Sequence, residues 1–159
     1  MIRPTRTQLA VCALALAAAV TAFGCGGGDD GEQVSAEELL DRGDRVCQEG
    51  QQRFAEIQRD TPADAGEAFE QTEELAEVAS EELDELERLD PPGELDESYD
   101  RYLEARGEAL DLLERGRDAA EERDAKAYDE AQNQLAADQR ERIELARAVG
   151  FEVCSKRTG

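Results

Sequence analysis

Residues 69–92 read FEQTEELAEVASEELDELERLDPP, a pattern typical of a helix that is followed by two prolines. Apolar or small residues recur every three or four positions, the spacing of one face of an α-helix. They are Phe69, Thr72, Ala76, Ala79, Leu83 and Leu86. Pro91 and Pro92 end the repeat, because proline lacks a backbone N–H and its ring clashes with the preceding turn. The stretch therefore predicts a long helix followed by a reversal of the chain.

The segment before it has the same pattern. Ser35 is the expected N-cap of a helix that ends near Arg59, with Glu38 completing a capping box. Its inward positions are Leu40, Gly43, Cys47, Gly50, Phe54 and Ile57. The second helix is expected to begin at Thr61, which precedes a proline, with Asp64 completing another box.

Two more helices are predicted after the proline pair. The third spans 94–123, and the fourth begins after the N-cap Asp124 and ends at Gly150, a left-handed C-terminal residue. The seam of the third is Leu95, Tyr99, Tyr102, Ala109, Leu113 and Ala120, and that of the fourth is Tyr128, Ala131, Leu135, Leu145 and Val149. No useful length alternates with period two, so no sheet is expected. We predict an all-α, antiparallel up-down four-helix bundle; the alternative is two helical hairpins that dimerise through coiled-coil seams.

Composition limits the core and the partners. The chain of 159 residues has a net charge of −22, 36% charged residues, 4% aromatic residues and no Trp. Its core must therefore be built largely from Leu and Ala. Charges are interleaved with regularly spaced apolar residues, which favours a folded domain. So negative a surface would be repelled by nucleic acid phosphates and anionic headgroups, and no nucleic acid partner is expected.

The N-terminus has the pattern of an export signal. Arg3 and Arg6 precede an apolar run, 9–23, which ends at Gly24 and Cys25. A signal that ends at a cysteine resembles that of a bacterial lipoprotein, although Ala22 and Phe23 replace the usual Leu and small residue. The resemblance implies cleavage before Cys25, lipidation of its sulfur, and anchoring to the outer face of the plasma membrane.

Two other interpretations of this segment stay open. Ordinary signal cleavage after Ala22 would leave Cys25 as a free thiol. An uncleaved membrane anchor is the second, but the apolar run is shorter than the roughly 20 residues that cross a bilayer. The expected organisation is a signal peptide at 1–24, a lipidated flexible linker at 25–34 and a helical bundle domain at 35–159.

The cysteine count agrees with export. Cys12 lies in the leader and Cys25 is the lipidation site, which leaves Cys47 and Cys154 in a compartment where disulfides persist. In an antiparallel bundle Cys47 lies about 17 Å along the first helix. We therefore predict a Cys47–Cys154 disulfide, with the tail turning back at Gly150; two unpaired buried cysteines are the alternative.

The mature pattern resembles uncharacterised exported bacterial helical proteins. The similarity consists of a cysteine in the first helix, the break at 89–92 (LDPP), and an ending Ala-x-x-x-Gly-x-x-x-Cys from Ala146 to Cys154. The resemblance implies a fold and a location, and no activity.

The sequence lacks the motifs of common catalytic and cofactor sites. With no histidine, Ser-His and Cys-His catalysis and histidine-ligated metals are excluded. No catalytic, cofactor-binding or metal-binding residue is predicted. Paired carboxylates such as Glu81-Glu82 are expected mostly on water-facing helix surfaces.

Arg106, Asp138 and Arg142 are the polar exceptions, because Arg106 falls on the inward seam of the third helix and the other two fall on that of the fourth. A buried charge needs a partner, so Arg106 and Asp138 are a candidate buried polar pair from neighbouring helices; the alternative is that these side chains reach the bundle edge. If the pair lines a cavity, an anionic or polar small molecule is the expected ligand.

These observations predict a lipid-anchored helical bundle of the cell envelope that is not an enzyme. It would act as an interaction or structural module, as monomer or homodimer, with an envelope protein as its partner. One rival is an extracytoplasmic lipoprotein that binds a small ligand or a divalent cation, and a second is a hydrolase that uses two carboxylates.

Overall fold

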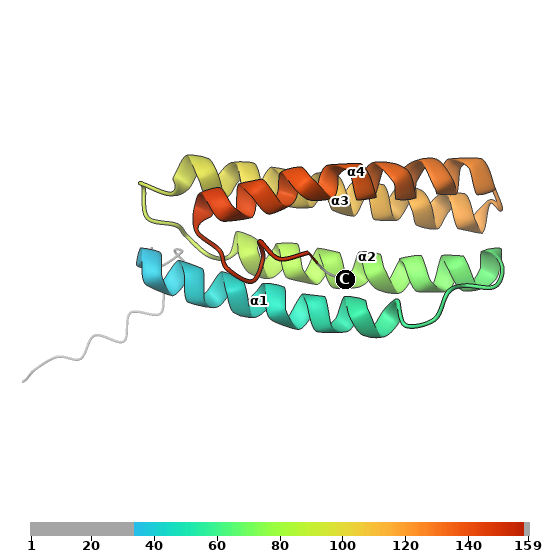
Figure 1. The fold of residues 1–159 in the computed structure, drawn as a ribbon, viewed down its shortest axis with the longest axis horizontal. Helices are drawn as coiled ribbons and strands as arrows, with labels where there is room; N and C mark the ends of the chain where they lie inside the picture. Colours follow the sequence, from blue (N-terminus) through green and yellow to red (C-terminus); the bar gives the residue numbers. More distant parts are fainter. Residues whose placement is uncertain (1–33, 158–159) are drawn as a thin grey trace, which may run out of the picture.

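Four antiparallel helices form the protein in the computed structural model, which describes residues 34–157. They are α1 (Ala36–Ile57), α2 (Ala65–Glu87), α3 (Asp96–Glu121) and α4 (Ala125–Val149). Successive helices run in opposite directions (Figure 1), so the predicted up-down bundle is confirmed. The predicted signal peptide, lipidation site and most of the linker lie outside the described residues.

Side-chain caps fix where the first two helices begin. The Ser35 hydroxyl accepts a hydrogen bond from Glu38 N, as the sequence predicts. The second helix begins later than expected, at Ala65, because the Asp64 carboxylate accepts from both Gly66 N and Glu67 N. Asp64 is therefore the N-cap itself, since its two bonds satisfy free N–H groups of the first turn.

The second hairpin follows the same logic. The Asp124 carboxylate caps α4 by accepting from Lys126 N and Ala127 N. Arg123 turns the chain with a φ of 58°, and Gly150 ends α4 in the left-handed region with a φ of 108°. The α3–α4 boundary and the Gly150 end were thus predicted within a few residues.

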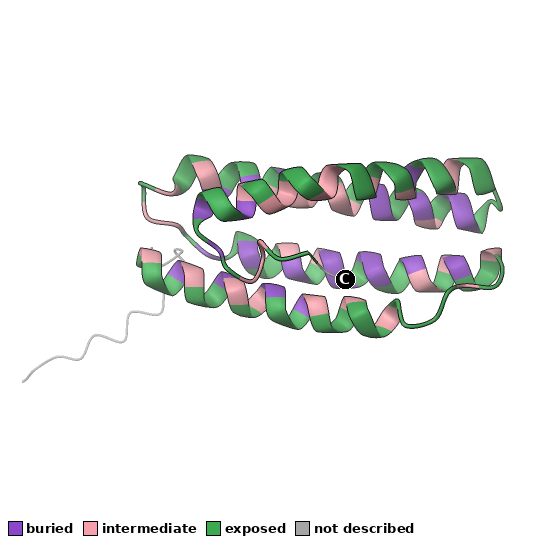
Figure 2. Ribbon diagram, viewed as in Figure 1, coloured by how far each residue is buried: buried purple, intermediate pink, exposed green. Residues whose placement is uncertain are grey.

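Burial is unequal among the helices. Helices α2 and α3 each bury eight residues, whereas α1 buries four and α4 three. In α4 these are Ala131, Ala146 and Val149, so no residue between 131 and 146 is fully buried. Figure 2 shows this as a largely exposed α4. The middle of α4 therefore does not complete the core.

One side of the bundle is left open. Helix α1 packs on α2, α2 on α3 and α3 on α4, while among the described residues α1 and α4 form no interface of this kind. The C-terminal tail, 150–157, lies between these two helices instead (Figure 1). Within the described range, no helix is long and apolar enough to cross a membrane.

The tail is fixed to α1 by a disulfide and by packing. Cys47 and Cys154 form the predicted disulfide, with 5.2 Å between their Cα atoms. Phe151 is 2% exposed and contacts the rings of Tyr99 and Tyr102. The tail therefore closes one end of the α1–α4 side and leaves the middle of that side open.

Candidate functional site

A cavity of about 330 Å³ occupies the open side between α1 and α4. All four helices and the tail contribute to its wall. Cavities that bind small molecules measure roughly 300–1,000 Å³, so this one has the volume for a small organic ligand. It is the candidate functional site.

One end of the cavity is polar and contains a buried ion pair. Arg106 Nη2 on α3 lies 2.5 Å from Glu82 Oε2 on α2, and the Glu82 side chain is 5% exposed. Burial raises the pKa of Glu82, while the positive charge of Arg106 opposes that rise. Gly50 on α1 leaves room for the carboxylate, because a Cβ there would come within 2.7 Å of Glu82 Oε2.

The partner of Arg106 differs from the one predicted. Asp138 is half-buried on α4, and none of the ion pairs between described residues joins it to Arg106. The prediction of an Arg106–Asp138 pair was wrong, because the arginine reaches α2 instead of its hairpin neighbour α4. The sequence does contain a signal for Glu82, since it falls on a second seam of α2 with spacings of four, three and four: Leu75, Ala79, Glu82 and Leu86.

Arg142 on α4 supplies a second guanidinium to this end. Its Nη2 donates to the backbone oxygen of Leu135 at 3.0 Å, and no carboxylate of the described chain forms an ion pair with it. Burial lowers the pKa of Arg142, the charge of Arg106 lowers it further, and Asp138 opposes both effects. Arg142 is therefore a partly buried cation with incomplete compensation.

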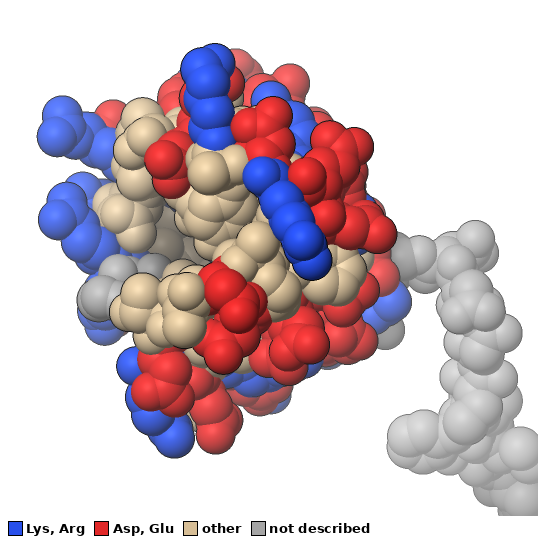
Figure 3. Space-filling model, turned by 90° about the vertical axis from the view of Figure 1, so that its right-hand side faces the viewer, with Lys and Arg blue, Asp and Glu red and all other residues tan. Residues whose placement is uncertain are grey.

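The charge of the cavity is opposite to that of the protein. Among the described residues, the charged side chains of its wall are three basic ones, Arg106, Arg142 and Lys156, and one acidic one, Glu82. The whole sequence has 18 basic and 40 acidic residues. Figure 3 views one end of the bundle, where Lys and Arg lie mostly along the left edge with others nearer the top and middle, and Asp and Glu lie at the top, right and bottom around a largely uncharged centre. The cavity is thus a local positive site in an acidic molecule.

The other end of the cavity is apolar. One residue from each helix forms what we call the apolar layer: Phe54, Leu75, Leu113 and Leu135. Each lies seven residues along its helix from a member of what we call the polar layer: Cys47, Glu82, Arg106 and Arg142. Seven residues are two helical turns, so the Cα atoms of the two layers are about 10 Å apart along each helix, a distance that the Arg142 side chain bridges by reaching Leu135 O.

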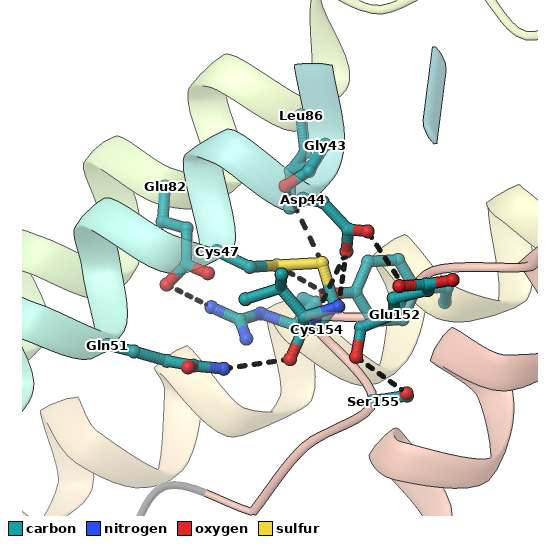
Figure 4. The surroundings of a disulfide bond; sticks show 12 residues. Gly43, Asp44, Cys47, Gln51, Glu82, Leu86, Glu152, Cys154 and Ser155 are labelled. Carbon is teal, nitrogen blue, oxygen red and sulfur yellow. Dashed lines mark hydrogen bonds and ion pairs between the residues drawn. A yellow bond between two sulfur atoms is a disulfide. The ribbon is translucent and has the colours of Figure 1, made fainter. Parts of the chain in front are cut away.

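The tail limits the polar end of the cavity. The Asp44 carboxylate on α1 accepts hydrogen bonds from three consecutive backbone N–H groups, those of residues 152–154, at 2.7–3.2 Å. The Gln51 amide donates to the backbone oxygen of Val153 at 3.0 Å. Figure 4 shows both side chains pointing toward the tail beside the disulfide. Tyr102 donates its hydroxyl hydrogen to Cys47 Sγ at 3.4 Å, since a disulfide sulfur has no hydrogen to give.

The structure brings together part of the predicted site. Cys47, Cys154 and Arg106 all line the cavity, whereas Asp138 does not and Cys25 lies outside the described residues. Glu82 is the one carboxylate among the described residues of the wall, so this part of the chain does not place there the two that the hydrolase rival requires. In the described part of the chain no three His, Cys, Asp or Glu side chains are grouped to hold a metal ion. Glu82 was expected on a water-facing surface and is buried, whereas Arg142 was placed on the inward seam but given no role in the site.

Comparisons with known proteins add no relative. A scan against protein-family models finds no match, and searches of the curated proteins and of the solved structures find none either. The function must therefore be inferred from the cavity itself.

Proposed function

We propose that this protein is a lipid-anchored, non-enzymatic binding module of the cell envelope, and that its bundle receives a small molecule between α1 and α4. One observation carries the proposal: the open side of the bundle holds a cavity of about 330 Å³ with a cationic end and an apolar end. A bundle with a purely structural role has no need for charged side chains around an unfilled interior, because burying charge is costly.

Export and lipidation are supported by the sequence and by the disulfide. Disulfides persist mainly outside the cytoplasm, and Cys47 and Cys154 are joined. A cysteine that follows a positively charged and apolar leader supports lipidation at Cys25. The acidic surface would not hold the protein on anionic headgroups, so attachment through acyl chains fits the charge.

The anchor is tested by intact-mass analysis of protein from native membranes. We expect a chain that begins at Cys25 and has the added mass of a diacylglycerol and an acyl group. An unmodified sulfur, or a chain that begins at another residue, would contradict the anchor. This outcome would leave the cavity argument unaffected.

The binding function is tested by screening small molecules for a rise in the melting temperature of the 25–159 chain. Binding to the folded state raises the melting temperature. The comparison variant is Ala109→Leu, whose larger side chain fills part of the cavity and should prevent binding there. We expect at least one compound that stabilises the wild type and not the variant. If every stabilising compound acts equally on both proteins, the proposed function is wrong.

A further inference from the structure

We infer that the ligand of this cavity is an amphiphilic carboxylate, with one negative charge at one end and an unbranched apolar body at the other. This inference rests on the proposed function and specifies the chemistry of the same site. It follows from the charge balance of the polar layer and from the apolar wall that the Arg142 side chain reaches.

The charge balance favours a single negative charge. Glu82 neutralises Arg106 within the polar layer, and Arg142 forms no ion pair with a described carboxylate, although the charge of Asp138 on the same helix acts on it. A guanidinium presents donors in a planar fork that matches a carboxylate. A dianion would bring a second charge close to the Glu82 carboxylate and would be repelled by it. A monocarboxylate is therefore the best match.

The position of Arg142 favours binding from inside the cavity. Arg142 is half-buried, and its hydrogen bond to Leu135 O uses one of its five N–H donors. The remaining donors are available to a ligand. The same residue pays a desolvation cost that lowers its pKa, and a bound carboxylate would offset that cost.

The apolar layer fixes the other part of the ligand. Phe54 and Leu135 are half-buried, and Leu75 and Leu113 are almost fully buried, so together they form an apolar wall. An apolar chain placed there is removed from water, at about 0.8 kcal/mol per buried CH₂ group. The Arg142 guanidinium reaches back to Leu135 O, so a carboxylate bound to it lies at the edge of the apolar layer, and an unbranched chain of several carbons extends from there along this wall.

The test uses octanoate as the probe, with calorimetric titration of the folded 25–159 chain. We expect saturable binding of octanoate, weaker binding of 1-octanol, which lacks the charge, and no saturable binding of acetate, which lacks the chain. In Arg142→Gln the affinity for octanoate should fall by about tenfold or more, the effect of losing a hydrogen bond to a charged group. The affinity of this variant for 1-octanol should not change.

The matched control is Arg140→Gln, which removes the same charge from an exposed position on the same helix. Its affinity for octanoate should stay within about twofold of the wild type, because an exposed charge contributes little. Circular dichroism and urea unfolding of each variant confirm that the bundle is folded.

Two results would overturn the inference. One is an equal affinity for octanoate in the wild type and in Arg142→Gln, and the other is 1-octanol binding as tightly as octanoate. A neutral compound that stabilises the wild type but not Ala109→Leu would then retain the proposed function and refute only the carboxylate. If no compound distinguishes those two proteins, both proposals fail.

Discussion

The ion pair between Arg106 and Glu82 is not symmetric. The Glu82 side chain is 5% exposed, whereas the Arg106 side chain is 20% exposed and lines the cavity. Buried pairs often contribute little net stability, but removing one partner leaves the other without compensation. The Glu82 carboxylate therefore needs the positive charge of Arg106 more than Arg106 needs the negative charge of Glu82.

Arg106→Gln should therefore be costly and Glu82→Gln should not. We expect the first variant to lose about 3 kcal/mol of unfolding free energy, because a buried carboxylate loses its cation. The second should change stability by less than about 1 kcal/mol, because Arg106 keeps its access to the cavity and the buried carboxylate is gone. Urea unfolding at pH 7 measures both; a larger loss in Glu82→Gln would contradict this account.

The same pair predicts a pH dependence. Burial raises the pKa of Glu82 above its ordinary value of 4.5. At a pH between the ordinary pKa and the raised pKa, Glu82 is protonated in the folded state and ionised in the unfolded state. The stability of the wild type therefore falls as pH rises through this range. Measured against Glu82→Gln, which cannot titrate at this position, the wild type should lose relative stability from about pH 4.5 upward. A difference that rises with pH would be inconsistent with a raised pKa.

At the scale of the elements, Gly43 lets the tail pack closely against α1. A Cβ on Gly43 would lie 2.6 Å from Cζ of Phe151, a side chain that is 2% exposed. Gly107 on α3 is different, because the nearest neighbour of its Cβ would be Leu83 Cδ2, at 4.0 Å. Both glycines lie in the interior of a helix, and they differ in the distance from an added Cβ to the nearest side chain.

Gly43→Ala should destabilise the protein, and Gly107→Ala should not. We expect a loss of about 1–3 kcal/mol at Gly43, because the Phe151 ring must move in a packed core. At Gly107 alanine should be neutral or stabilise by up to about 1 kcal/mol through its helix propensity. Thermal and urea unfolding of the two variants give the comparison. Equal effects at both positions would mean that the tail does not pack on α1 as described.

The element boundaries show what local signals predict well. The caps Ser35 and Asp124 and the terminating Gly150 lie where the sequence indicates. Each acts on backbone groups within a few residues, so its effect is readable without the fold. The start of α2 was predicted at Thr61 and lies after Asp64. Thr61 and Asp64 were both possible N-caps, and Asp64 caps the helix because its carboxylate accepts two backbone hydrogen bonds.

At the scale of the whole molecule, the disulfide replaces the missing α1–α4 interface. Cys47 and Cys154 are separated by 107 residues, so their bond links the first helix to the end of the chain. The Asp44 and Gln51 contacts with the tail add hydrogen bonds beside it. The fold is thus closed by a covalent bond at one end while the cavity stays open.

Removing the disulfide should loosen the tail and lower global stability. For Cys47→Ala with Cys154→Ala we expect a loss of about 2–5 kcal/mol in unfolding free energy. Chemical reduction of the wild type should reproduce this loss. Hydrogen exchange should show faster exchange of the amides of 152–154, because these amides donate to Asp44 on α1. A loss below about 1 kcal/mol would show that the packing of Phe151 and the hydrogen bonds of Asp44 and Gln51 fix the tail without the disulfide.

The sequence by itself determined the helices, their antiparallel order and the Cys47–Cys154 pairing. These depend on periodicity, on capping residues and on a count of cysteines, all of which act along the chain. It also placed Arg106 inward. Its carboxylate partner, the open α1–α4 side and the cavity were decided only by the tertiary structure.

The physical reason is the rotation of each helix about its own axis. One residue further along a helix turns a side chain by about 100°, so a rotation of α2 by that angle would put Leu83 where Glu82 lies. That rotation is set by the packing of all four helices and by the tail, which no local pattern encodes. Hence periodicity could identify a helical face, and only the packed bundle could select Glu82 for Arg106 and leave Arg142 facing the cavity.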